Sequence, residues 1–216
     1  MIRPRMYINK AVSEGFAILG AAHASLAWRL RASEREDAPL GLRFAPDDFE
    51  WVEASQFDEL KQSGTHLVIS ESTLGNRESI LVVGGPGVVL APLPERVAAL
   101  EGGATFMQKP LKMYILLLEH IPLAHALAAS ATASVQCYEA FADDPVMKEW
   151  VSGRFAKSVC ALNERELASA QETRDHCVIR SGDSEQVVGV AFCPRQQWPG
   201  NFGFYRIFRK TQNWWA

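Results

Sequence analysis

The sequence predicts an α/β protein built from two tandem small domains, each a four-stranded mixed sheet flanked by helices. One observation is that a strand–turn–strand segment at 65–86 is followed much later by a similar segment at 175–194. Another is that a short apolar strand precedes an alanine-rich helical segment in both halves. The chain has 216 residues, of which 48% are hydrophobic, enough to bury one large core or two small ones.

The predicted elements of the first half are a strand at 6–8, a helix over 15–31, a strand at 50–54, a helix over 57–62, and hairpin strands at 67–70 and 80–84. Ser13 or Glu14 starts the first helix, and Ser55 caps the second. Small residues along the first helix let it lie close to a sheet. Segment 33–48 holds seven charged residues and two prolines, so it is predicted to be a solvated excursion.

The predicted elements of the second half are a strand at 112–119, a helix over 122–141, a helix at 147–151, a strand at 157–162, a helix over 164–171, and hairpin strands at 177–180 and 186–192. Asn163 caps the third of these helices. The proline-rich stretch between the halves suggests the domain division, with a first copy at 1–90, a linker at 91–111 and a second copy at 112–216.

The two halves also correspond residue by residue. Met6-Tyr7-Ile8 comes again as Met113-Tyr114-Ile115, an offset of 107, and alanines of the two long helices match at the same offset. After a slip of three residues, His66 of the first hairpin matches His176 of the second. This order predicts a duplication whose copies pack as a pseudo-dimer.

Composition narrows the class of protein. The four cysteines form no CxxC pair and sit beside apolar residues, which predicts reduced, buried thiols and a cytoplasmic protein. The N-terminus has no continuous apolar run of a signal peptide, and the apolar stretch 113–135 is broken by Glu119, His120 and His125, so no membrane association is expected. No cofactor motif is present, and the spacing of His120 and His125 does not suit a zinc site, so no metal is predicted.

Particular residues carry a resemblance to a known family. The first half has Gly15 at the start of its first helix, His23-Ala24 within that helix, a Thr65-His66-Leu67-Val68 strand, and Gly85-Pro86 after its last strand. The second half keeps Gly182 in the hairpin turn and Pro194 after the last strand. In these features residues 6–86 and 112–194 each resemble the type II peptidyl-tRNA hydrolase fold.

The resemblance implies the fold, and the family's active-site positions can be compared one by one. The family's first helix opens Gly-Lys, with the lysine catalytic, and its hairpin carries an Asp and a Thr in the active site. At these positions the first copy has Phe16, Ser70 and Leu74, and the second hairpin has Arg180 and Ser184. Leu and Phe supply neither a base nor an oxyanion donor, so the family's catalytic residues are not retained.

Polar residues near those positions are the candidate catalytic site. Glu71 is the best substitute acid, with Ser70 beside it, and His23 on the first helix is the third candidate. Thr73 and His66 would bind a ligand at the same hairpin. The alternative is an ordinary solvated turn and a helix histidine that serves packing.

Two more groups of polar residues suggest ligand contacts. Glu119, His120 and His125 cluster at the end of a strand, where α/β sheets usually bind ligands. Arg180, with Arg154 and Asp183, would bind an anion at the second hairpin, or form a surface ion pair.

The C-terminal segment 201–216 interleaves aromatic residues with Arg206, Arg209 and Lys210, a pattern that can stack bases and contact phosphates. Its alternation over 202–209 also suits a strand at a sheet edge, with Trp214 and Trp215 packed on the other half or on another subunit. The second interpretation is favoured.

The sequence therefore predicts a divergent peptidyl-tRNA hydrolase-like protein that binds or processes a tRNA-linked or nucleotide-like ligand. If it is an enzyme, it is a hydrolase or acyltransferase acting on an ester-linked substrate; a tRNA-dependent acyl transferase is one alternative. A non-catalytic protein-interaction module whose aromatic C-terminal segment binds a protein partner is the other. Further self-association of the chain through the same segment is also expected. The formal net charge of −3 does not favour a strong nucleic-acid binder.

Overall fold

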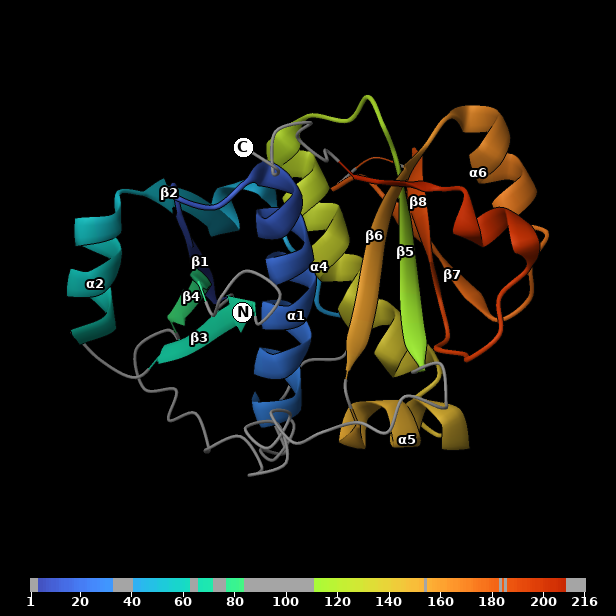
Figure 1. Cartoon of the computed structure of the whole chain (residues 1–216), viewed down its shortest axis with the longest axis horizontal. Helices are drawn as coiled ribbons and strands as arrows, with labels where there is room; N and C mark the ends of the chain where they lie inside the picture. Colours follow the sequence, from blue (N-terminus) through green and yellow to red (C-terminus); the bar gives the residue numbers. More distant parts are fainter. Residues whose placement is uncertain are drawn as a thin grey trace.

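A computed structural model describes residues 4–32, 41–62, 66–71, 77–83, 111–153, 155–182, 184 and 186–208. The described elements form an α/β structure in which two helices, α1 (Glu14–Ala32) and α4 (Leu123–Ala140), lie between two mixed sheets (Figure 1). Residues 91–110 of the predicted linker, Thr73, Arg154, Asp183, Arg209, Lys210 and the terminal tryptophans lie outside the described residues.

The first sheet consists of β1 (Arg5–Asn9), β2 (Phe49–Val52), β3 (His66–Glu71) and β4 (Arg77–Val83), in the order β2-β1-β4-β3. Helix α2 (Ala54–Gln62) covers its outer face, where Val52 and Phe57 pack with Tyr7 and Leu60. The helix begins three residues earlier than predicted, and Phe57 N donates to Glu53 O at 2.9 Å, so Ser55 lies in its first turn and is not its cap.

The second sheet consists of β5 (Lys112–Leu118), β6 (Ala156–Leu162), β7 (His176–Arg180), β8 (Val187–Phe192) and β9 (Arg206–Ile207), in the order β7-β8-β5-β6-β9. Helix α5 (Pro145–Ser152) lies at one end of this sheet, and α6 (Glu164–Ala170) lies beyond its outer face (Figure 1). Asn163 caps α6 as predicted, because its side chain accepts from Glu166 N at 2.9 Å. The sheet has five strands rather than four, because β9 joins the edge at β6.

The first four strands of each sheet are arranged in the same order. In each, the first two strands in sequence are parallel, and the next two strands form two antiparallel pairs, β1-β4 and β3-β4 in the first sheet and β5-β8 and β7-β8 in the second. Each hairpin also has an irregularity at the same place, between Ile69 and Ser70 in the first sheet and between Ile179 and Arg180 in the second.

Backbone hydrogen bonds indicate which residues of the first sheet and of the second occupy equivalent positions. Lys10 N donates to Val52 O at 3.0 Å, and Glu119 N donates to Leu162 O at 2.9 Å. These bonds relate β1 to β5 at an offset of 109 and β2 to β6 at 110. The predicted offset of 107 is therefore wrong by two residues for β1. An error of two residues leaves every strand side chain on the same face of the sheet, because strand side chains alternate. In the helices, alanine is so frequent that alanines match at either offset.

Small residues bring α1 and α4 close together. At the offset of 109, Ala22 and Ser25 correspond to Ala131 and Ser134, and all four side chains are fully buried. Ser25 Oγ donates across the interface to Ala131 O at 3.0 Å, and Ser130 Oγ donates to Ile18 O at 3.0 Å. Hydroxyl groups can reach the opposite backbone only because no larger side chain separates the helices.

A buried ion pair and the segment after α1 close this interface. Arg29 Nε lies 2.8 Å from Glu139 Oε1, with 7% and 14% of the side chains exposed. Segment 41–48 was predicted to be solvated, but Leu42 and Phe44 are buried and Phe44 N donates to Thr132 Oγ1 at 2.9 Å. Charged residues dominate this segment, so the sequence analysis missed two apolar side chains that cover part of α4.

The outer face of the second sheet carries an aromatic cluster of Tyr114, Phe192, Trp198, Phe202 and Tyr205. Phe202 belongs to a 3₁₀ helix (Gly200–Gly203), and among the described residues of this segment Arg206 and Ile207 form the strand that pairs with β6. The predicted edge strand is thus confirmed for two residues and is wrong for its first part. Among the described residues, no helix has the length and hydropathy that a membrane crossing requires.

Candidate functional site

The first hairpin spreads its predicted site residues along one strand. His66 begins β3, while Ser70 and Glu71 end it beyond the irregularity, opposite Glu78 and Arg77 of β4. Four residues of strand separate His66 from Ser70, about 13 Å. The backbone therefore keeps Ser70 and Glu71 together and holds His66 at the other end of β3.

His23 lies between the two halves. Its ring centroid is 5.6 Å from that of Phe155, and its Nδ1 is 3.5 Å from the Nζ of Lys157, which comes from β6 of the other sheet. Burial, and then the neighbouring Lys157, hold the pKa of His23 well below its ordinary value of 6.5. The structure thus brings His23 to Lys157, which the sequence analysis did not single out.

Lys157 is an unusual lysine. It is 7% exposed, and its Nζ lies 3.4 Å from the ring centroid of Phe155 and 4.8 Å from that of Trp150. Burial lowers the pKa of Lys157 well below its ordinary value. The aromatic rings supply cation–π stabilisation to the charged form. No polar pattern around Lys157 in the sequence indicates this environment, because His23 is 134 residues away.

The predicted arginines lie at opposite edges of the second sheet. Arg180 ends β7 and Arg206 begins β9, so four strand spacings, about 19 Å, separate them. Arg206 Nη2 bonds Glu119 Oε2 at 2.7 Å. Arg5, on the first sheet, lies 3.8 Å from Glu50. The described arginines therefore do not converge on one hairpin, and a role for each stays a prediction.

Of the predicted polar cluster, Glu119 and His120 follow the carboxyl end of β5, and His125 lies in the first turn of α4. All three are exposed, and Glu119 is held by Arg206. Within the described residues, no group of three His, Cys, Asp or Glu side chains is arranged to hold a metal ion.

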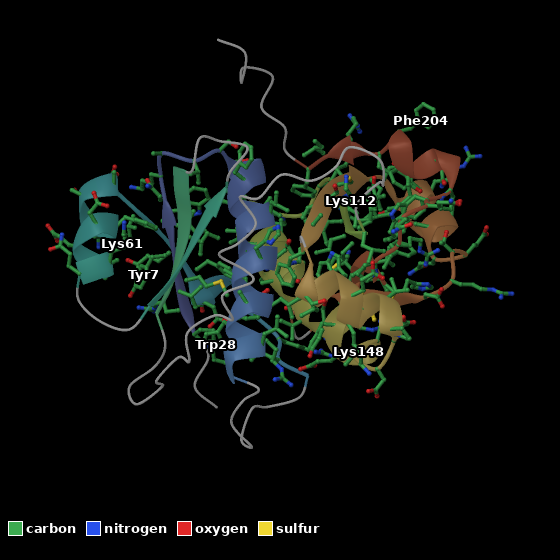
Figure 2. The ribbon with its side chains drawn as sticks, turned by 60° about the horizontal axis from the view of Figure 1, so that its bottom comes forward. Tyr7, Trp28, Lys61, Lys112, Lys148 and Phe204 are labelled. Carbon is green, nitrogen blue, oxygen red and sulfur yellow. The ribbon has the colours of Figure 1, made fainter. Side chains whose placement is uncertain are left out.

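A pocket of about 460 Å³ opens beside the carboxyl end of β6; we call it the α6 pocket. The residues that line it are Asn163, Arg165, Glu166, Ser169, Asn201, Phe204 and Tyr205. Phe204 is 86% exposed and projects from the molecule (Figure 2). The Nδ2 of Asn201 donates to Tyr205 Oη at 3.0 Å, while burial raises the pKa of Tyr205. The pocket therefore offers an exposed aromatic ring, a guanidinium and amide groups together.

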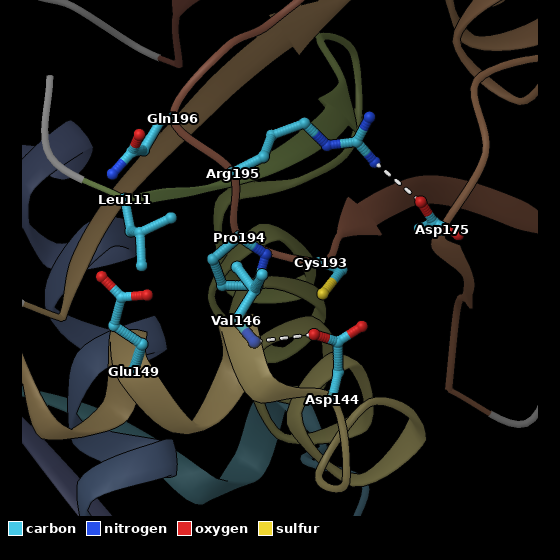
Figure 3. Close-up of a pocket in the computed structure, with 9 residues that line it drawn as sticks. All are labelled: Leu111, Asp144, Val146, Glu149, Asp175, Cys193, Pro194, Arg195 and Gln196. Carbon is cyan, nitrogen blue, oxygen red and sulfur yellow. Dashed lines mark hydrogen bonds and ion pairs between the residues drawn. The ribbon is translucent and has the colours of Figure 1, made fainter.

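A second pocket, of about 490 Å³, lies at the opposite end of the second sheet; we call it the α5 pocket (Figure 3). Asp144, Glu149, Asp175 and Arg195 supply its charges, and Arg195 Nη2 lies 3.6 Å from Asp175 Oδ2. Asp144 is already used, since its Oδ1 accepts from Val146 N at 2.7 Å and so caps α5. None of the predicted site residues lines this pocket.

Sequence reasoning found the α6 pocket only in part. It selected Asn163 as a helix cap and Phe204-Tyr205-Arg206 as an aromatic and basic segment. It missed Arg165, which looks like an ordinary charge on a short helix until Tyr205 and Phe204 fold back beside it. Proximity of residues about 40 positions apart depends on β9 pairing with β6.

The chain matches no protein-family model, and neither the curated proteins nor the solved structures contain a significant match to it. The resemblance to the type II peptidyl-tRNA hydrolases therefore stays a prediction.

Proposed function

We propose that this chain is a divergent peptidyl-tRNA hydrolase-like protein that binds a nucleotide-like or tRNA-linked ligand in the α6 pocket without the family's catalytic residues. The observation that carries the proposal is the grouping of Phe204, Tyr205 and Arg165 in one open pocket. An exposed aromatic ring offers a base a stacking surface, and guanidinium groups suit phosphate oxygens.

The position of the pocket supports the same proposal. It lies beside the carboxyl end of β6, where Asn163 follows the strand, and ligands of α/β sheets usually bind at such ends. The side-chain amides of Asn201 and Asn163 can hydrogen-bond to ribose hydroxyls and base edges in addition to the bonds that they already make. The net charge of −3 favours a small nucleotide or one strand end over a long nucleic acid.

We further propose that the two sheets, with α1 and α4 between them, are two copies of one fold packed as a pseudo-dimer. The matching strand order and the backbone bonds at offsets of 109 and 110 support this proposal. With this offset, Ala124-His125 corresponds to Gly15-Phe16, so neither copy has a lysine where the family has its catalytic lysine. Binding without hydrolysis is the expected outcome.

The experiment is a calorimetric titration of the full chain with AMP and with the trinucleotide CCA. We expect binding that the F204L substitution weakens about tenfold or more, because stacking contributes ~1–3 kcal/mol per base and Leu retains the apolar bulk without the ring face. R165A should weaken AMP but not adenosine. R43A is the matched control, since Arg43 is exposed on the segment before β2. Equal affinity of F204L and the unsubstituted chain would contradict the proposal.

Hydrolysis is measured separately with N-acetyl-aminoacyl-tRNA. We expect no release of the acyl group above the rate in buffer. Turnover abolished by S70A or E71Q would instead make the first hairpin an active site and overturn the proposed loss of catalysis.

A second candidate function rests on the same surface. Phe204 and Ile207 are 86% and 57% exposed, and β9 forms the edge of its sheet, a favourable position for another copy to add a strand. Self-association predicts a sedimentation mass that falls on I207S while AMP binding is unchanged. If the chain sediments as a monomer at all concentrations, this candidate fails.

A further inference from the structure

The residues that line the α6 pocket differ in exposure. Glu166 and Tyr205 are partly buried, whereas the other five lining residues, among them Phe204 and Arg165, are exposed. The exposed ring is the stacking surface of the function proposed above. The two less exposed side chains have less water around them, so their hydrogen bonds to a ligand discriminate more sharply than bonds made by the exposed residues.

Glu166 is held in place by the cap of α6. Its Oε2 accepts from Asn163 N at 2.8 Å, and its own backbone N donates to Asn163 Oδ1 at 2.9 Å. No described residue donates to its other carboxylate oxygen, Oε1. Glu166 therefore offers the pocket a fixed acceptor that is free to take a donor from a ligand.

Tyr205 supplies the complementary group. Its Oη accepts from Asn201 Nδ2 at 3.0 Å, so the hydroxyl hydrogen is left to donate. Its ring packs against Phe202, with the ring centroids 5.3 Å apart. Burial, and then the negative charge of Glu166, raise the pKa of Tyr205, so the hydroxyl stays protonated at neutral pH. The pocket thus combines a fixed acceptor with a fixed donor.

Nucleic-acid bases differ in what their Watson–Crick edges offer to such a pair. Adenine and cytosine each have an exocyclic amino group, which donates, beside a ring nitrogen that accepts. Guanine, uracil and hypoxanthine have a carbonyl oxygen and a ring N–H at these two positions, so the donor and the acceptor are exchanged. A carboxylate cannot donate to that carbonyl oxygen, and the two oxygens repel each other.

We propose that Glu166 and Tyr205 make the α6 pocket selective for nucleotides with an amino base, adenine or cytosine, over nucleotides with a keto base. Glu166 Oε1 accepts from the amino group of the base, and Tyr205 Oη donates to the ring nitrogen beside it. This inference rests on the nucleotide-binding function proposed above and adds the class of base that the pocket takes.

The test is a calorimetric titration of the full chain with AMP and with IMP, which differ only at the Watson–Crick edge of the purine. We expect AMP to bind about tenfold or more tightly than IMP, because IMP loses a hydrogen bond to a charged group and places an oxygen against it. Equal affinities would overturn the selectivity, while the proposed function stands if F204L weakens both nucleotides. If neither nucleotide binds, the proposed function and the selectivity are both wrong.

E166Q changes the acceptor without removing the helix cap. Gln also closes a capping box, because its amide oxygen can accept from Asn163 N, and its amide nitrogen then stands as a donor where Oε1 was an acceptor. We expect E166Q to lower the preference for AMP over IMP about tenfold or to reverse it. The matched control is E164Q, on the same helix but outside the pocket, which should keep the preference. An unchanged preference in E166Q contradicts the role of Glu166.

Y205F tests the donor, since it removes the hydroxyl and keeps the ring that packs on Phe202. It should weaken AMP several-fold more than IMP, because the ring nitrogen of adenine loses the group that donates to it. Equal weakening of the two nucleotides would contradict the role of Tyr205.

Discussion

The two sheets have the same backbone plan and different side chains at corresponding positions. Ile8 and Ile80 pair in the first sheet, and both are fully buried. Their counterparts Leu117 and Gly189 pair in the second sheet. The two isoleucines fill similar volumes, whereas Leu117 supplies nearly all of the side-chain volume of its pair. The strand pairing and its register are thus the same in both sheets, while the sizes of the paired side chains differ.

The difference is greater at the interface between the halves. His23 of α1 reaches Lys157 of the second sheet, while Thr132, the corresponding residue of α4, accepts from Phe44 of the first-half segment. Glu139 pairs with Arg29, but its counterpart on α1 is Leu30. The two halves therefore have similar backbones but different polar contacts at corresponding positions. Substitutions at such pairs of positions measure how much each contact contributes to stability.

The largest expected effect is at the buried ion pair. E139Q removes the carboxylate that binds Arg29 and also accepts from Gly41 N at 2.8 Å. Because the guanidinium is left buried without a counter-charge, we expect a loss of about 3 kcal/mol in the free energy of unfolding, measured by urea denaturation.

The matched control is E53Q. Glu53 pairs with Lys10 at 2.7 Å, but 67% and 50% of these side chains are exposed, so the loss should stay below about 1 kcal/mol. Equal losses for E139Q and E53Q would show that the interface between α1 and α4 does not depend on this pair.

Next in size is the position where the sheets differ in volume. A Cβ at Gly189 would clash with the carbonyl oxygen of Leu116 and lie 2.6 Å from the Cδ2 of Leu117. We expect G189A to lower the free energy of unfolding by about 2–3 kcal/mol, since the nearest atom is backbone and cannot move aside cheaply. G200A is the control, because a Cβ at Gly200 meets nothing within 4 Å and should change stability by less than about 0.5 kcal/mol. A neutral G189A would mean that Leu117 and β8 readjust freely.

The third prediction concerns acid stability at the interface. The pKa of His23 in the folded chain is well below the ordinary 6.5. Below that pH the unfolded chain binds a proton at His23 while the folded chain does not, so the unfolded state is favoured as pH falls. We expect the free energy of unfolding to fall more steeply from about pH 7 to about pH 5 in the unsubstituted chain than in H23N. H125N, at an exposed position of α4, should keep the steep fall, and an identical slope for H23N would refute the assignment.

The sequence was sufficient for most elements and insufficient for their contacts. Apolar alternation located the two hairpins, and alanine content located α1 and α4, because both signals are local. Leu42 and Phe44 were missed because charged neighbours dominate their segment. The contact of His23 with Lys157 and the position of Arg165 and Phe204 in one pocket depend on packing between residues far apart in the chain, which no local pattern records. The similar order of elements in the two halves was visible in the sequence, yet the offset between their strands needed the backbone hydrogen bonds.

The smallest expected effect compares two serines at corresponding, fully buried positions. Ser25 Oγ donates to Ala22 O at 3.2 Å and to Ala131 O at 3.0 Å, whereas Ser134 Oγ has no hydrogen-bond partner among the described residues. S25A should therefore cost about 1 kcal/mol in the free energy of unfolding, and S134A should be neutral or stabilising, because it removes a buried hydroxyl that gains nothing from burial. Paired denaturation curves under identical conditions measure the difference directly. Equal costs for the two substitutions would mean that Ser134 finds an equivalent bond, and that the helix interface is more symmetric than these contacts indicate.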